Sequence, residues 1–444
     1  MRRIRLFMAI GFLLALMVMP TAGSAAVPQP VLTAMCQGLY GGVFGTPNAE
    51  PFGVCQWDMA IINAGDSGSY EHATGDGVSV GVIDSGVDLT HPDIAPNLDV
   101  ARSCSFIFSN TPTAAPQEIA NGDCTNKAAV QDLAGHGTHV ASEIAAPVNG
   151  IGIAGVAPEA TIVALKACTQ AGFCFVDSVA AALRYAGDQR LDVVNLSLFA
   201  DPFLYYCKSD AEQRSLLREM ESAARYAQQR GVVIVASAGN EQADLHHPVI
   251  DDISPDWPPD TAEEREVKNN CQVAPAELPE TLTVSATGPI GYPDYDLWIA
   301  DYSSVGVDVA APGGDYFRAT GTVQDAVLGA VPMNSEIWAG FDPLNVFFPG
   351  ITATDAGAGY VYLNGTSMAS PHAAGVAALV VENHPNWGPG AVKAAVERTA
   401  QHLDCPPNWE PLSPADERYK CYGDDGHTSF FGHGLVDALA AAEH

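Results

Sequence analysis

Three side chains in the sequence have the types that nucleophilic hydrolysis requires: a carboxylate, an imidazole and a hydroxyl. Asp84 ends a short apolar run, His136 lies between two glycines, and Ser367 stands in the segment Asn-Gly-Thr-Ser-Met-Ala-Ser-Pro-His at 364–372. A serine hydroxyl is a poor nucleophile near neutral pH, so it needs a base within hydrogen-bond reach, and the base needs a third group that holds it in one tautomer. The three residues therefore predict acyl transfer by Ser367, with His136 as base and Asp84 as its orienting group.

The local position of each residue favours that chemistry. Ser367 stands where a turn leads into a predicted helix, so a backbone N–H and the positive end of the helix dipole favour a developing oxyanion. His136 opens another predicted helix between glycines that permit close approach of the chain. Asp84 ends a predicted buried strand, where its carboxylate is shielded from water and can accept the imidazole N–H.

The elements that must position these residues alternate along the chain. Apolar runs of strand length are followed by helical patterns, of which 210–230 is the clearest. The predicted strands are 78–83, 161–165, 192–197, 232–236 and 281–285. This alternation predicts an α/β fold with three layers, a doubly wound and mostly parallel sheet with helices on both faces. Active sites of such sheets lie at the carboxyl ends of the strands, where Asp84 and Asn240 are expected.

Three segments resemble the signatures of the subtilisin-like serine peptidases. They are Val-Ile-Asp-Ser-Gly at 82–86, Gly-His-Gly-Thr-His-Val at 135–140 and Gly-Thr-Ser-Met-Ala-Ser-Pro at 365–371, and they occur in the family's order of Asp, His and Ser. The resemblance extends from about Gln56 to the end of the chain. It implies a subtilisin-like fold and a serine endopeptidase that needs no cofactor for its chemistry.

The resemblance also implies an oxyanion-hole residue. Residues 235–240, Val-Ala-Ser-Ala-Gly-Asn, are similar to the family strand that ends in the oxyanion-hole asparagine. The Asn240 amide would then lie opposite the Ser367 backbone N–H, where such a donor stabilises the transition state. The alternative is a turn asparagine with no catalytic role, because Asn after Gly is ordinary turn chemistry.

By analogy with the family, Ser197, Leu198 and Phe199 line the substrate cleft and pair with an extended peptide. Many relatives have glycine where Phe199 stands, so the resemblance leaves the primary specificity open. Asp93 and Asn149 match side-chain ligands of a structural calcium ion, with the carbonyls of Ile151 and Ile153 nearby. The alternative for both residues is an ordinary place in a turn.

The N-terminus has the pattern of an export signal. Three arginines precede the apolar run Leu6–Met19, and small residues follow it, so that residues 1–26 are predicted to be a signal peptide. Cleavage after Ser24, Ala25 or Ala26 would satisfy the small-residue rule. An uncleaved anchor is the alternative, but the run is shorter than the roughly 20 residues that a span needs. The mature chain is expected outside the cytoplasm, secreted or periplasmic, as a monomer with no membrane span.

Charge and cysteine content agree with export. The formal net charge is −32, which argues against nucleic acid as a partner and favours solubility. Ten cysteines in an exported chain predict disulfides, and zinc ligation is disfavoured because no CxxC or HExxH occurs. Spacing suggests pairs of neighbours, although sequence does not determine connectivity. The pairs are Cys36–Cys55, Cys104–Cys124, Cys168–Cys174, Cys207–Cys271 and Cys405–Cys421.

The domain plan that follows has an arm and one catalytic domain. Residues 27–55, rich in Gly and Pro, are predicted to form an irregular arm that is too short to be a pro-domain, and residues 56–444 form a single catalytic domain. Loop insertions are predicted near 201–208, 243–271 and 314–359.

The resulting functional hypothesis is a secreted endopeptidase that cleaves proteins or peptides, in general protein degradation. A narrow maturation protease for one exported precursor is the alternative within the same class. A noncatalytic peptide-binding module on a peptidase fold is the alternative from another class, because a fold alone does not fix function.

Overall fold

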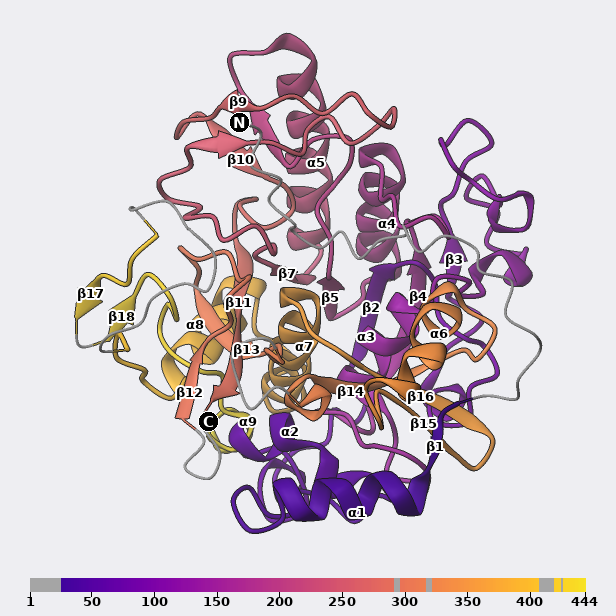
Figure 1. Ribbon diagram of the computed structural model, residues 1–444. Helices are drawn as coiled ribbons and strands as arrows, with labels where there is room; N and C mark the ends of the chain where they lie inside the picture. Colours follow the sequence, from indigo (N-terminus) through magenta and orange to yellow (C-terminus); the bar gives the residue numbers. More distant parts are fainter. Residues whose placement is uncertain (1–24, 291–295, 317–321, 407–418, 425) are drawn as a thin grey trace.

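A twisted sheet runs through the centre of the protein (Figure 1). The computed structural model describes residues 25–290, 296–316, 322–406, 419–424 and 426–444. In these residues the strands of this sheet follow the order β3-β4-β2-β5-β7-β11-β12, with β13 beside β11. All neighbours are parallel except the pair β11–β12. The bounds are β2 (Ser79–Asp84), β3 (Cys104–Ser105), β4 (Thr161–Lys166), β5 (Val193–Leu196), β7 (Val233–Ser237), β11 (Thr281–Ile290), β12 (Asp296–Ile299) and β13 (Val309–Pro312).

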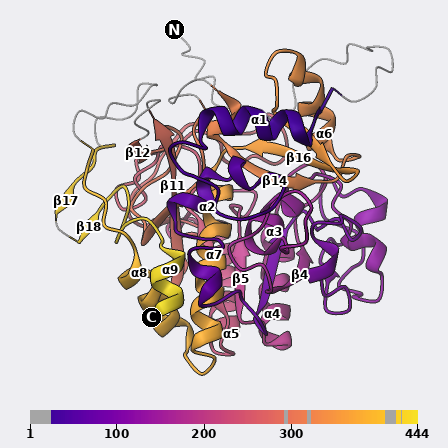
Figure 2. The ribbon, with the colours of Figure 1, turned by 90° about the horizontal axis from the view of Figure 1, so that it is seen from below.

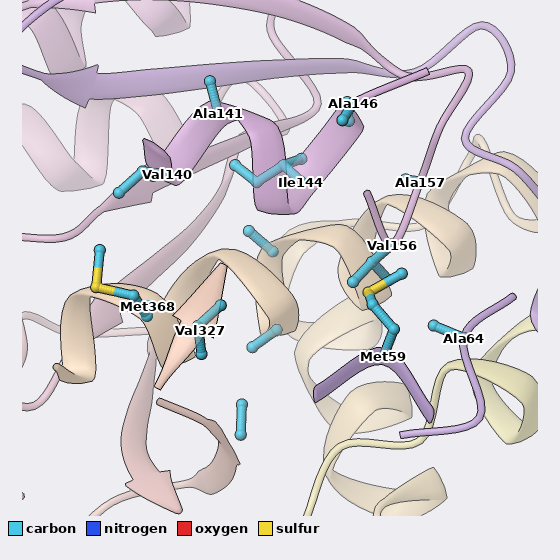
Figure 3. Close-up of a cluster of buried hydrophobic side chains, with 14 of the residues drawn as sticks. Met59, Ala64, Val140, Ala141, Ile144, Ala146, Val156, Ala157, Val327 and Met368 are labelled. Carbon is cyan, nitrogen blue, oxygen red and sulfur yellow. The ribbon is translucent and has the colours of Figure 1, made fainter. Parts of the chain in front are cut away.

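Alternating side chains of the central strands enter two separate cores, because helices cover both faces of the sheet. In β7, Val233 and Val235 belong to the core on one face and Ile234 to the core on the other. The helices are α3 (His136–Ala145) and α7 (Thr366–Asn383) on the first face, and α4 (Val176–Gln189) and α5 (Ala211–Gln228) on the second. Figure 3 shows the first core, where Val140 and Ile144 of α3 lie near the helix that carries Met368. The predicted three-layer α/β fold is confirmed.

A second sheet changes the prediction for the N-terminal arm. The arm was expected to be irregular, but it contains a short strand and a helix of eleven residues, and the helix packs against the second sheet and buries Leu32 and Cys36 (Figure 2). This apolar face of the helix outweighs the local Gly and Pro content. The elements of the arm and of this sheet are β1 (Val27–Pro28), α1 (Gln29–Leu39), β14 (Val327–Val331), α6 (Glu336–Phe341), β15 (Thr352–Asp355) and β16 (Ala358–Leu363). Their strand order is β1-β15-β16-β14, so the described part of the predicted insertion 314–359 contains the strands β14 and β15, the helix α6 and the start of β16.

The prediction of a surface loop near 201–208 is also partly wrong. Residues 205–207 form a buried strand, β6 (Tyr205–Cys207), that pairs antiparallel with β10 (Cys271–Val273). Tyr205 and Tyr206 are buried. The acidic and Pro-rich composition of 243–271, the segment that leads to the partner strand, gave no indication of a buried strand pair. Within 243–271, two-residue strands β8 (Ile250–Asp251) and β9 (Arg265–Glu266) pair with each other. The remaining elements with regular structure are α2 (Trp57–Ile61), α8 (Pro389–Thr399), α9 (Ala438–Glu443), β17 (Gly423–Asp424) and β18 (His427–Thr428).

All five predicted disulfides are present, with the predicted partners. The Cys207–Cys271 bond joins two of the predicted insertions and closes the longest of these loops, with a sequence separation of 64. The predicted signal peptide lies outside the described residues except for Ala25 and Ala26. None of the helices in the described ranges combines the length and apolar character that a membrane crossing requires.

Candidate active site

The structure brings Asp84 and His136 into direct contact. Asp84 ends β2, and its carboxylate is 2 % exposed. His136 begins α3, and its Nδ1 lies 2.8 Å from Asp84 Oδ1 and 3.0 Å from Asp84 Oδ2. A carboxylate in this position accepts the Nδ1–H, so Nε2 is left as the basic nitrogen on the other side of the ring.

Glycines and a buried aspartate allow α3 to approach β2 this closely. A Cβ on Gly137 would lie 2.1 Å from the Gly86 carbonyl oxygen, so only glycine fits after His136. Asp132 fixes the start of the helix: its Oδ1 accepts from the N–H of Gly135 (2.8 Å), and its Oδ2 accepts from the N–H of Thr138 (2.9 Å). These bonds satisfy N–H groups that the first turn of a helix leaves unpaired.

Ser367 is the second residue of α7, and a proline in the helix helps to anchor it. Pro371 has no N–H, so the carbonyl of Ser367, four residues earlier, lacks the usual helical donor. The Ser197 hydroxyl donates to that carbonyl instead, at 2.8 Å. The Ser367 hydroxyl donates to the Ser197 carbonyl at 3.3 Å, not to His136. Catalytic hydrogen bonds are often long or misaligned without substrate, and rotation about χ1 can redirect this hydroxyl.

Asn240 lies beside the nucleophile segment. Its Oδ1 accepts from the backbone N–H and from the hydroxyl of Thr366, both at 2.9 Å, and the side chain is fixed by these bonds. Because the carbonyl oxygen is held by Thr366, the amide nitrogen is the end of the side chain that can donate elsewhere. This orientation is compatible with the predicted role of Asn240 as an oxyanion donor.

One cavity of about 400 Å³ brings the predicted residues together. Its wall includes all four residues of the predicted catalytic set, Asp84, His136, Asn240 and Ser367. The predicted substrate residues Ser197, Leu198 and Phe199 also line it. The cavity therefore has room for a ligand beside Ser367.

Electrostatics prepare His136 to accept a proton. Burial lowers the pKa of His136, but the charge and hydrogen bond of Asp84 outweigh it, so the pKa is raised above 6.5. Lys166 lies beneath this region: its buried Nζ donates to the carbonyl of Ser85 (2.7 Å) and pairs with Glu118 (2.9 Å). It thereby fixes the turn that follows Asp84.

Asp132 and Lys166 position the site, and the sequence interpretation missed both. A signal for each was available. Asp132 lies three residues before the N-cap residue Gly135, close enough in sequence to reach the first turn, and Lys166 is a charged residue at the end of an apolar strand. A lysine in such a place needs a buried partner.

The predicted calcium ligands Asp93 and Asn149 are neighbours, with Asn149 Nδ2 at 3.3 Å from Asp93 Oδ1. Asp93 also accepts from the N–H of Ile153 (3.1 Å), and Asn149 Oδ1 accepts from the N–H of Ile151 (2.8 Å). Burial, together with the nearby charge of Glu50, raises the pKa of Asp93 to about 8. The described residues contain no cluster of three His, Cys, Asp or Glu side chains placed to hold a metal.

A test of the calcium hypothesis is whether oxygen atoms in this region lack partners. Glu50 Oε2 is buried and has no hydrogen-bond partner among the described residues, while Glu50 Oε1 accepts from the N–H of Gly150 (3.1 Å). An orphaned carboxylate oxygen beside a second buried carboxylate suits a hard cation. Asp93, Glu50 and the side-chain oxygen of Asn149 are donors of the kind that calcium takes.

Comparison with known proteins identifies the family. The model of the subtilase family matches residues 75–434. M-protease from Shouchella clausii (strain KSM-K16) is 30 % identical over 387 residues, which are 87 % of this chain and 69 % of M-protease. Subtilisin Savinase from Lederbergia lenta is 29 % identical over 387 residues, which are 87 % of this chain and 97 % of that protein.

Among solved structures, fervidolysin from Fervidobacterium pennivorans, described as a keratinolytic enzyme related to subtilisin, matches with a TM-score of 0.58 and 26 % identity. The match covers 89 % of this chain and 46 % of fervidolysin, so this chain corresponds to about half of it. The chain is a subtilisin-like serine endopeptidase and belongs to the subtilase family.

Proposed function

We propose that this subtilase is an extracellular endopeptidase of general protein degradation, in which Ser367 attacks the peptide carbonyl and His136 transfers the proton to the leaving amine. Asp84 holds the imidazole and stabilises the imidazolium, while the Asn240 amide and the Ser367 N–H bind the oxyanion. The observation that carries the proposal is the direct contact between Asp84 and His136 on the wall of the cavity that also contains Ser367. The five disulfides support the extracellular location.

A fluorophosphonate probe tests the assembled site. The purified chain is incubated with the probe and digested, and the modified residue is mapped by mass spectrometry, with His136→Ala as the control. Labelling of Ser367 that disappears in the control supports the proposal. A folded chain that is not labelled would favour a noncatalytic peptide-binding module instead. Broad digestion of casein would count against a narrow maturation protease.

Replacing Asn240 with leucine is expected to lower kcat by about 10²–10³-fold, the loss that removal of one such donor causes in subtilisin. KM is expected to change little, because the donor binds charge that develops only in the transition state. Steady-state kinetics on a peptide amide measure both constants. A rise in KM of similar size with an unchanged kcat would instead assign Asn240 to substrate binding.

The pH profile of kcat/KM is expected to rise with an apparent pKa above 6.5, because only neutral His136 can accept the Ser367 proton. Activity is therefore present above this pKa and is lost as the pH falls through it. Burial raises the pKa of Glu241, on the same cavity wall, to about 7, so the profile is repeated with Glu241→Gln. An ascending limb that is centred below 6.5 in both proteins would contradict the assignment.

We also propose that Asp93, Asn149 and Glu50 hold a structural calcium ion, which takes no part in the chemistry. The orphaned Glu50 oxygen supports this proposal. Chelation with EDTA is expected to lower Tm by about 3–8 °C, from the linkage between binding and stability. The measurement uses Ser367→Ala protein, in which self-digestion does not contribute, and Asp93→Asn is the control that should not respond. Equal Tm values with calcium and with EDTA would remove the ion from the proposal.

A further inference from the structure

A fully buried ion pair lies next to the residue that orients the base. Lys166 Nζ lies 2.9 Å from Glu118 Oε1, and neither side chain has exposed surface. In the pairing of β2 with β4, Lys166 is the register partner of Asp84. Burying two charges is costly, and replacing such a pair with apolar side chains is often neutral or stabilising. Stability alone is therefore a weak explanation for a buried pair in this place.

The ammonium group of Lys166 holds the two turns that carry carboxylates of the site. It donates to the carbonyl of Ser85 at 2.7 Å and to the carbonyl of Gln131 at 3.0 Å. Ser85 directly follows Asp84, and its hydroxyl donates to Asp132 Oδ1 at 2.9 Å. Gln131 directly precedes Asp132. A displacement of the ammonium would therefore move both aspartates.

Glu118 reaches Lys166 from a loop that a disulfide closes. Ser105 pairs with Lys166 from β3, the edge strand of the central sheet, and its hydroxyl donates to the Glu118 carbonyl at 2.8 Å (Figure 1). The Cys104–Cys124 bond joins the two ends of this loop. One carboxylate oxygen of Glu118 accepts a backbone N–H within the loop. The other oxygen, Oε1, has no hydrogen-bond donor among the described residues and is balanced by the ammonium.

We infer that Glu118 is a positioning residue of the catalytic site, which acts through Lys166 on the turns that carry Asp84 and Asp132. It holds the ammonium in place and balances its charge, so that the negative charge of both aspartates remains available to His136. The inference deepens the proposed function and rests on it, because it takes His136 as the base of the reaction.

The electrostatic connection to the base runs through Asp132. Burial raises the pKa of Asp132, and the charge of Lys166 opposes that rise. Burial lowers the pKa of His136, whereas the charges of Asp84 and Asp132 raise it. Without Glu118 the unbalanced ammonium would cancel more of this negative potential, so the pKa of His136 would fall.

Other titratable groups surround the contact between Asp84 and His136. They are His139 and Glu143 of α3, His372 of α7, and Asp201, Glu241, Asp256 and Glu336 on the cavity wall. A substitution of Glu118 changes none of these side chains. A change in the pKa of His136 that follows such a substitution therefore reports on the Glu118–Lys166 pair.

The first measurement is an NMR titration of His136 in Ser367→Ala protein, which needs no peptidase activity. Glu118→Gln is expected to lower the pKa of His136 by about 0.5–1, the Coulomb effect of one charge at the edge of the site. The matched control is Glu382→Gln, which should leave this pKa unchanged. Glu382 accepts from two backbone N–H groups (2.8 and 2.6 Å) and lies at the other end of α7 from Ser367.

The second measurement is kcat/KM against pH in chains that keep Ser367. For Glu118→Gln the ascending limb is expected to move to lower pH by the same amount, with a plateau lower by about tenfold because the turns are held less firmly. The double variant Glu118→Gln/Lys166→Met removes both charges. Its limb should return toward the wild-type position, while its plateau stays low because the bonds to the two carbonyls are lost.

A role in stability alone predicts a different result: a lower Tm in both variants, with the pKa of His136 and the plateau unchanged. That result would overturn the inference. If Glu118→Gln does not fold, the double variant decides, because it leaves no buried charge unpaired: a wild-type plateau overturns the inference, and a low plateau from folded protein supports it. A wild-type chain that cleaves no peptide would refute the proposed function, whereas the NMR titration would still decide the role of Glu118.

Discussion

Replacing Ser367 with alanine is expected to lower kcat about 10⁶-fold, as for the nucleophile of subtilisin, and to leave the fold intact. In the proposed mechanism the Ser367 hydroxyl forms the acyl-enzyme, so its removal deletes the covalent route. The side chain is partly exposed, and its hydroxyl makes a single 3.3 Å bond to the Ser197 carbonyl, so little stability is lost. The measurement is kcat on a peptide amide, with protein that has never contacted active enzyme.

Ser370→Ala is the matched control. It removes a hydroxyl from the same helix whose oxygen lies 2.8 Å from Ser197 Oγ, but it does not line the cavity. Its effect on kcat should be small beside that of Ser367→Ala. Residual activity of Ser367→Ala within about tenfold of wild type would mean that another group is the nucleophile.

Replacing Asp84 with asparagine is expected to lower kcat by about 10⁴-fold. The amide can keep the geometry but presents an N–H to Nδ1, so the imidazole takes the wrong tautomer and Nε2 can no longer accept the Ser367 proton. Kinetics on the same peptide amide measure the loss, and fluorophosphonate labelling should slow in parallel. The ascending pH limb should also move to lower pH, since the charge that raises the pKa of His136 is gone.

The control for Asp84→Asn is Asp88→Asn, an aspartate four residues later whose carboxylate caps the local turn by accepting from Thr90. Its loss should affect stability more than kcat. If Asp84→Asn retains labelling and turnover near the wild-type level, His136 is not oriented by Asp84, and the assignment of the base fails.

The sequence predicted the central sheet well because both faces of each strand are buried. Runs such as 232–236 are apolar and are followed directly by a polar residue. The strand and the residue at its carboxyl end could therefore be identified together. The same property underlies the prediction of the site, whose residues line one cavity. Asp84 and Asn240 follow strands, and such positions meet at one edge of a parallel sheet.

The N-terminal arm and the insertions were harder because their structure depends on distant partners. Val27 pairs with Ala353, more than three hundred residues away, and no local pattern indicates such a pairing. Likewise Tyr205 and Val273 pair only because the chain folds back through a long acidic segment. Local composition predicted loops in both places, and tertiary packing decided otherwise.

The disulfide between Cys168 and Cys174 has a consequence for producing this protein in the laboratory. The short segment that it closes carries Gln170 and Phe173, which form part of the cavity wall, whereas the contact between Asp84 and His136 lies outside it. Protein made in a reducing cytoplasm would lose the covalent brace of that wall. A host that exports the chain to an oxidising compartment is therefore the appropriate source for any measurement of selectivity.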